Sequence, residues 1–160
     1  MLAHTSCPPG RRTLSLSRMS RSATEDYGLV GATDASGYHA AVEFDRFTIA
    51  LLIRRPDAPQ LNEEEAAALQ DAHMAHLADL HASGHLLAAG PLAFEDPSEE
   101  FRGLSILNVD PEQARALKED DPAVRAGLYT IKVLPWIVPG GAMSFSAARF
   151  PRSIAEAAGD

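Results

Sequence analysis

Four short apolar segments between residues 44 and 138 constrain the fold of this chain more than any other feature. The first, residues 47–53, is a near-continuous apolar run with β-branched members, and its length and composition predict a buried strand. The other three also have strand length and lie between turn-forming or charged residues, at 86–89, 103–109 and 128–138. The segments that connect these four strands decide how the sheet is built.

Two helices are predicted between the strands. The first begins after Asn62, which can accept a hydrogen bond from the first turn, and Glu65 three residues later completes a capping box. Gly84 is expected to end this helix in the left-handed conformation. The second helix is predicted at 111–119, because Asp110 is a good N-cap and a proline fits the first helical position.

The resulting order is strand, helix, strand, strand, helix, strand, which predicts an α+β fold of the ferredoxin-like split β-α-β-β-α-β type. Both helices then lie on one face of the sheet. The strands carry apolar residues for both faces, so the second face needs a cover as well. A homodimer that pairs the sheets face to face, in the manner of a dimeric α/β barrel, would supply that cover, with Trp136 at or near the interface.

Composition excludes several classes of protein. The chain has 160 residues, 46% hydrophobic and 22% charged, as expected for one globular domain. A net charge of -8 argues against nucleic acid as a partner. No apolar run is long enough to span a membrane. Cys7 is the only cysteine, so no intrachain disulfide forms, and a reducing, cytoplasmic location is expected.

The sequence divides into three parts. Residues 1–43 are rich in Ser, Arg, Thr, Gly and Ala and are predicted to be a disordered, low-complexity extension. A transit peptide, or translation from a downstream start at Met19, are the other interpretations of this segment. Residues 44–145 form the predicted α+β domain. Residues 146–160 are small, contain the helix-interrupting Pro151, and are expected to be a flexible tail.

Histidines are the main candidates for chemistry. His73 lies about 40° from Leu69 on a helical wheel, in the middle of the apolar stripe of the first helix. A histidine there is either a structural residue with a satisfied hydrogen bond or an acid/base group. His73 and His76 are spaced to face one metal ion, but no third ligand is recognisable, so no metal site is predicted.

Other motifs give weaker indications of function. Gly90 and Pro91 form either a plain turn or a turn that directs backbone amides toward a pocket. Gly140 and Gly141 do not lie between a strand and a helix, so they are not a phosphate loop. Ser105 lacks the glycines of a nucleophile elbow. With no binding fingerprint present, no redox or nucleotide cofactor is expected.

Two stretches resemble the YCII-related (YciI-like) proteins. The first is residues 72–91 (AHMAHLADLHASGHLLAAGP), and the second is residues 121–129 (DPAVRAGLY), just before the last strand. The resemblance covers about residues 44–138. It implies a ferredoxin-like fold that dimerises through its sheets. It also implies a His/Asp acid/base pair in a pocket, here His73 and Asp121.

The resulting hypothesis is a cofactor-independent enzyme that transfers a proton on a small organic molecule, as an isomerase, lyase or hydrolase-type enzyme. His73 takes or gives the proton, Asp121 fixes its tautomer, and the backbone at Gly90 and Pro91 lines the substrate pocket. The alternative is a dimer that binds a small ligand, or another protein, without transforming it.

Overall fold

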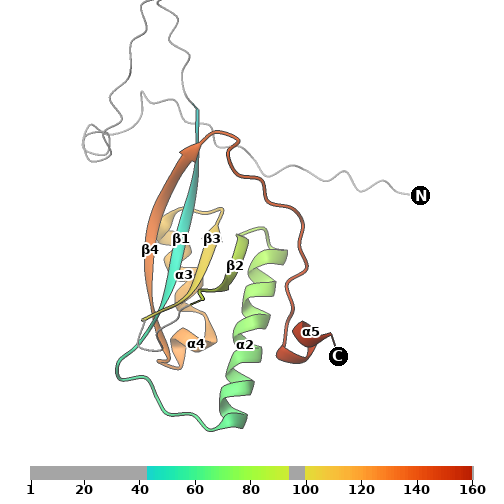
Figure 1. The fold of residues 1–160 in the computed structure, drawn as a ribbon. Helices are drawn as coiled ribbons and strands as arrows, with labels where there is room; N and C mark the ends of the chain where they lie inside the picture. Colours follow the sequence, from blue (N-terminus) through green and yellow to red (C-terminus); the bar gives the residue numbers. More distant parts are fainter. Residues whose placement is uncertain (1–42, 94–99, 160) are drawn as a thin grey trace, which may run out of the picture. The chain divides into compact units, whose positions relative to one another are not determined.

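A computed structural model describes residues 43–93 and 100–159 of the chain, and within them four strands form one sheet (Figure 1). The sheet order is β2-β3-β1-β4, and β3 pairs antiparallel with both β1 and β2. The strands are β1 (Phe44–Arg54), β2 (Leu86–Pro91), β3 (Phe101–Leu107) and β4 (Tyr129–Pro139). The predictions for residues 1–42 lie outside the described residues.

The helices complete the predicted order. They are α2 (Glu63–Ala82), α3 (Pro111–Glu119), α4 (Pro122–Arg125) and α5 (Ile154–Ala158). With α2 between β1 and β2, and α3 between β3 and β4, the topology is the ferredoxin-like split β-α-β-β-α-β arrangement. The predicted α+β fold class is therefore confirmed. None of the helices in the described part of the chain is long and apolar enough to cross a membrane.

Local sequence signals set the ends of the main helix as predicted. The Asn62 side chain accepts a hydrogen bond from the backbone N–H of Glu65 at 2.9 Å. The Glu65 carboxylate in turn accepts from the backbone N–H of Asn62 at 3.0 Å, which completes the capping box. At the other end Gly84 adopts φ of 76°, a left-handed conformation that costs glycine little. α2 therefore starts and stops where the sequence requires.

The register of the sheet separates two faces. On one face, cross-strand pairs between β1 and β3 are buried beneath the helices. These pairs are Thr48–Leu107, Ala50–Ser105 and Leu52–Gly103. Ala50 and Leu107 belong to the core cluster that also contains Leu80 of α2 and Ala114 of α3, so both helices cover this face. On the other face, the pairs Ile49–Ile106 and Leu51–Leu104 are only partly buried.

The described residues fall into two compact units. The larger one, residues 47–136 with 145–159, contains the helices and most of the sheet. The smaller one contains residues 43–46 and 137–144, where the backbone N–H of Gly140 donates to the carbonyl of Glu43 at 2.7 Å. A backbone hydrogen bond thus joins the residue before β1 to the residue after β4.

The C-terminal segment, which we expected to be a flexible tail, carries the short helix α5 and contacts α2. The Phe150 ring stacks on His81 with 4.3 Å between centroids, and Arg152 donates to the Asp79 carboxylate at 2.6 Å. Pro151 does exclude a continuous helix, but Ser153 caps a new one by accepting from the backbone N–H of Glu156. Packing against α2 therefore continues beyond residue 145, where the sequence predicted the domain to end.

Substitution of Phe150 tests this contact. We expect Phe150→Ala to lower the free energy of unfolding by about 1 to 2 kcal/mol, because a partly buried aromatic ring and its stacking on His81 are lost. Ile154→Ala, at a side chain that is 46% exposed, should stay within about 0.5 kcal/mol of the wild type. Urea denaturation measures both. Equal stability of all three proteins would indicate a tail that does not pack.

Candidate active site

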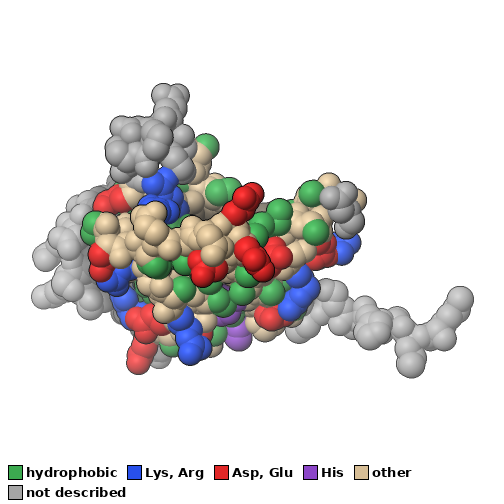
Figure 2. Space-filling model, turned by 90° about the horizontal axis from the view of Figure 1, so that it is seen from below, with side chains coloured by type: hydrophobic (Ala, Val, Ile, Leu, Met, Phe, Trp, Pro, Cys, Tyr) green, Lys and Arg blue, Asp and Glu red, His purple; other side chains and the backbone are tan. Residues whose placement is uncertain are grey.

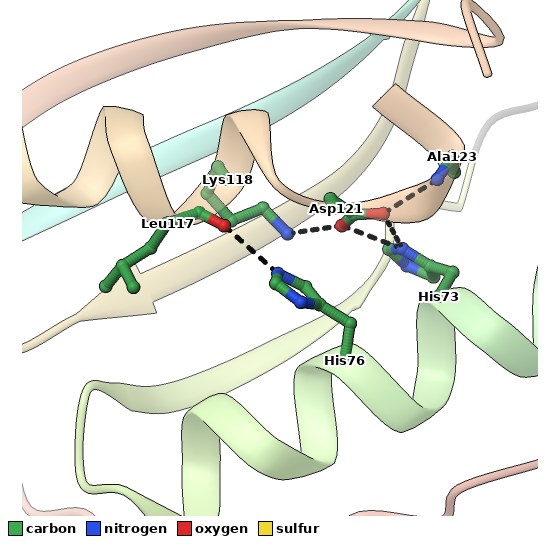
Figure 3. A network of polar contacts seen from close by, with 6 residues as sticks. All are labelled: His73, His76, Leu117, Lys118, Asp121 and Ala123. Atoms are coloured by element: carbon green, nitrogen blue, oxygen red, sulfur yellow. Dashed lines mark hydrogen bonds and ion pairs between the residues drawn. The ribbon is translucent and has the colours of Figure 1, made fainter. Parts of the chain in front are cut away.

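His73 and Asp121 meet although 48 residues separate them in the sequence (Figure 3). His73 projects from α2 toward the junction of α3 and α4, where Asp121 is the N-cap of α4. The distances from His73 Nδ1 to the two carboxylate oxygens are 2.8 and 2.9 Å. The pairing of these two residues, which the family resemblance implies, is thus present in the geometry.

The Asp121 carboxylate is fully buried and receives two further donors. Lys118 Nζ donates to Oδ2 at 2.9 Å, and the backbone N–H of Ala123 donates to Oδ1 at 3.0 Å. The Lys118 and Asp121 side chains both have 0% exposure, while His73 keeps 12%. Three donors from three elements therefore hold one buried carboxylate, and only the histidine reaches solvent.

This environment keeps Asp121 ionised. Burial alone would raise its pKa, but the hydrogen bond from His73 and the charge of Lys118 outweigh burial and lower the pKa of Asp121 to about 2. An ionised carboxylate can only accept hydrogen bonds, so the proton of a neutral His73 resides on Nδ1. The Nε2 atom is then left with a free lone pair, which is the form that a general base requires.

His76 and His81 are held in a different way. His76 Nε2 donates to the carbonyl of Leu117 at 3.0 Å, and His81 Nδ1 donates to the carbonyl of Leu86 at 2.9 Å. Burial lowers the pKa of His76, against the opposing charge of Asp121. Within residues 43–93 and 100–159, no three His, Cys, Asp or Glu side chains are grouped to hold a metal ion. Each of these two rings is thus held by a backbone carbonyl instead of a carboxylate.

A cleft of about 270 Å³ is lined by neighbours of the His73–Asp121 pair, although neither His73 nor Asp121 is itself among the lining residues. Ala123, whose N–H binds Asp121, forms part of its wall, and so do Leu69 and Gln70, one helical turn (about 5 Å) before His73. Figure 2 views the molecule from the end where α2 begins, and hydrophobic side chains gather there between acidic and basic ones. A small molecule in this cleft would be separated from the histidine by these neighbouring residues.

The structure does not bring Gly90 and Pro91 to this cleft. They end β2 and line a separate, mostly apolar hollow of about 220 Å³ with Leu92 and Leu104. Gly90 pairs with Leu104 on the sheet face that the helices leave uncovered, whereas His73 and Asp121 lie on the helical side. A role for Gly90 and Pro91 in binding substrate stays a prediction.

Two residues of this region were missed by the sequence analysis. Lys118 lies four residues after Ala114, so both occupy the buried face of α3, and that spacing could have marked it as a buried cation near Asp121. Arg54 lines the cleft and follows Thr48, Ala50 and Leu52 at even spacing along β1. Its place on the helical side could have been deduced from strand alternation.

Comparison with known proteins identifies the family. The model of the YCII-related domain matches residues 48–137, more than half of the chain. The chain therefore belongs to the YCII-related family, as the motifs around His73 and Asp121 indicated. The comparison with curated proteins found no match.

Two solved structures are similar at low identity. One is 5-chloro-2-hydroxyhydroquinone dehydrochlorinase from Burkholderia phenoliruptrix AC1100 in complex with 2,5-dihydroxybenzoquinone, 23% identical, with a TM-score of 0.41 over 56% of this chain and 92% of that chain. The other is a dimeric protein of unknown function with a ferredoxin-like fold from Bacteroides fragilis NCTC 9343, 14% identical, with a TM-score of 0.38 over 57% and 93%.

The low pKa of Asp121 predicts how stability depends on pH. Because the folded value of about 2 lies below the usual 3.8, ionised Asp121 stabilises the fold above about pH 4, and this contribution is lost as the pH falls toward 2. The loss should be about 2 kcal/mol. Urea denaturation between pH 6 and 2 should therefore give a steeper fall for the wild type than for Asp121→Asn. Parallel curves for the two proteins would contradict an ionised, paired Asp121.

Proposed function

We propose that this protein is an enzyme that transfers a proton on a small organic molecule, with His73 as the acid/base group. Neutral His73 takes the proton of the substrate on Nε2 and returns it to the product. Asp121 accepts the Nδ1–H throughout, which orients the ring and stabilises the imidazolium that forms. The chain's own side chains supply this chemistry without a redox or nucleotide group.

The observation that supports this function most is the environment of the Asp121 carboxylate. A histidine that only needs a hydrogen bond can use a backbone carbonyl, as His76 and His81 do. His73 instead binds a fully buried carboxylate whose charge Lys118 balances. Removing an ion pair from water costs several kcal/mol per ion, and an apolar side chain would often be equally stable there. The charges are therefore better explained by their effect on His73 than by stability.

The exposure of the site agrees with proton transfer. His73 is 12% exposed, while both of its charged neighbours are closed off from solvent. A substrate that contacts the exposed part of the ring would therefore not touch Asp121 or Lys118 directly. Water is largely excluded from the pair, which strengthens its electrostatic interactions.

Hydrogen exchange into substrates tests the function without knowledge of the full reaction. Small carbonyl compounds with an acidic C–H are incubated with the protein in D₂O, and loss of the C–H signal is followed by proton NMR. We expect the wild type to catalyse exchange for members of this panel. His73→Gln should slow exchange by about 100-fold or more, since a positioned base contributes about 10²- to 10⁴-fold.

The matched control is His85→Gln, because His85 Nδ1 contacts only the hydroxyl of Ser83 at a partly exposed position. Its exchange rate should equal that of the wild type. Asp121→Asn should also lose activity, because an amide N–H directed at Nδ1 favours the tautomer with Nε2 protonated. Compounds that bind without any exchange between pH 5 and 9 would instead support the alternative, a ligand-binding protein.

We also propose that the chain forms a homodimer through the sheet face that α2 and α3 leave open. The pairs Ile49–Ile106 and Leu51–Leu104 form an apolar row on this face, and Leu134 of β4 is 38% exposed. Exposed apolar area of this kind favours burial at about 25 cal/mol per Å². The hollow lined by Gly90 and Pro91 includes Leu104, so a second subunit would border it.

Sedimentation velocity at micromolar concentration tests the dimer. We expect a species of about twice the 17.1 kDa of the chain. Leu51→Glu, which places a charge in the middle of the apolar row, should shift the protein to monomer. Ala67→Glu introduces the same charge at an exposed position of α2 and should leave the dimer intact. A monodisperse wild-type monomer would rule out this assembly.

A further inference from the structure

The cleft beside His73 has a distinctive charge pattern. Arg54 is the only charged residue among the described residues that line it. The other polar groups of the lining are neutral donors or acceptors, from Gln60, Gln70 and Tyr129. The rest is apolar, with Leu61, Leu69 and Leu128 among the walls. A cationic ligand would meet an arginine here with no carboxylate in the lining to balance its charge.

Arg54 and its neighbour Arg55 differ in their partners. Arg55 binds both oxygens of Asp57, at 2.9 and 2.7 Å, and its charge is thereby balanced. Among residues 43–93 and 100–159, no carboxylate lies within ion-pair distance of the Arg54 guanidinium. Arg54 is the last residue of β1, where alternation places it on the same face as the buried residues Ala50 and Leu52, while Arg55 lies beyond the strand. Of these two arginines, the one without a carboxylate partner among the described residues is the one in the cleft.

We infer that the cleft binds a small organic carboxylate, with the Arg54 guanidinium as its anion-binding group. The planar guanidinium presents two parallel N–H donors that match the two oxygens of a carboxylate. The apolar body of the ligand then lies between Leu69 and Leu128. At about 270 Å³ the cleft is smaller than the roughly 300–1,000 Å³ of sites for drug-sized ligands, so it suits a small acid.

This inference rests on the proposed function only in naming the acid as the substrate class. The ligand's carboxylate would be at Arg54, and its reactive end would be on the side of Ala123 and His73. The glutamates in the first turn of α2 are exposed and are not part of the lining, so solvent screens their repulsion of an anion.

Binding of matched acids and amides tests the inference. The probes are benzoate with benzamide and 3-methylbutanoate with 3-methylbutanamide, each titrated into ¹⁵N-labelled full-length protein and followed by amide chemical shifts. We expect at least one of the two acids to shift the amide signals of residues in the cleft. Its amide should bind at least about tenfold more weakly, because a hydrogen bond to a charged group is stronger than one between neutral groups by about this factor in affinity.

Substitutions identify the group responsible. Arg54→Gln should weaken binding of the acid by about tenfold or more, and Arg54→Lys should recover part of the affinity. Arg55→Gln removes the same charge next to it and should change affinity by less than about twofold. Spectra that superimpose outside the cleft ensure that each variant is folded.

The outcomes separate this inference from the proposed function. His73→Gln should keep its affinity for the acid within about twofold, because His73 does not contribute the anion contact. Equal binding of acid and amide, unchanged affinity in Arg54→Gln, or no binding of any probe would overturn the inference. None of these results would alter the exchange activity expected of His73. Loss of activity in His73→Gln with intact binding would support both.

Discussion

The buried carboxylate of Asp121 is the interaction on which the helical side of this structure depends. Its donors come from α2, from the end of α3 and from the backbone of α4, so one charged group joins three elements. An unpaired carboxylate at 0% exposure would be prohibitively unstable. The three elements therefore meet with Lys118 and His73 both directed at Asp121. The requirement to satisfy this charge helps to position His73.

The charges of Lys118 and Asp121 also limit the role that each side chain of the site can have. Lys118 and Asp121 neutralise one another inside the protein, so a neutral His73 completes the site without leaving a net charge buried. Lys118 has no exposed surface and binds Asp121, which makes it a positioning residue rather than a group that reaches a ligand. Only His73 combines contact with the carboxylate and access to solvent.

Local signals in the sequence were sufficient for the fold. Capping by Asn62 and Asp110 and termination by Gly84 are short-range effects, and the structure follows them closely. The His73–Asp121 pairing required the family motifs, since many carboxylates were available and composition could not select one. Lys118 and Arg54 were overlooked because a charged residue is ordinarily assigned to solvent. Only the contact between helices buries Lys118, whereas Arg54 stays exposed at the end of β1 and lines the cleft.

The two faces of the sheet carry different side chains of β1. Because side chains alternate along each strand, β1 contributes Thr48, Ala50 and Leu52 to the helical side and Ile49, Leu51 and Ile53 to the open side. The helical row ends at Arg54, beyond the reach of the core cluster, where a charge can be tolerated. A shift of one residue in register would move the cation to the open face and an isoleucine into the cleft. The same alternation that gives the open face its apolar row therefore supplies the cleft with the one charged residue of its described lining.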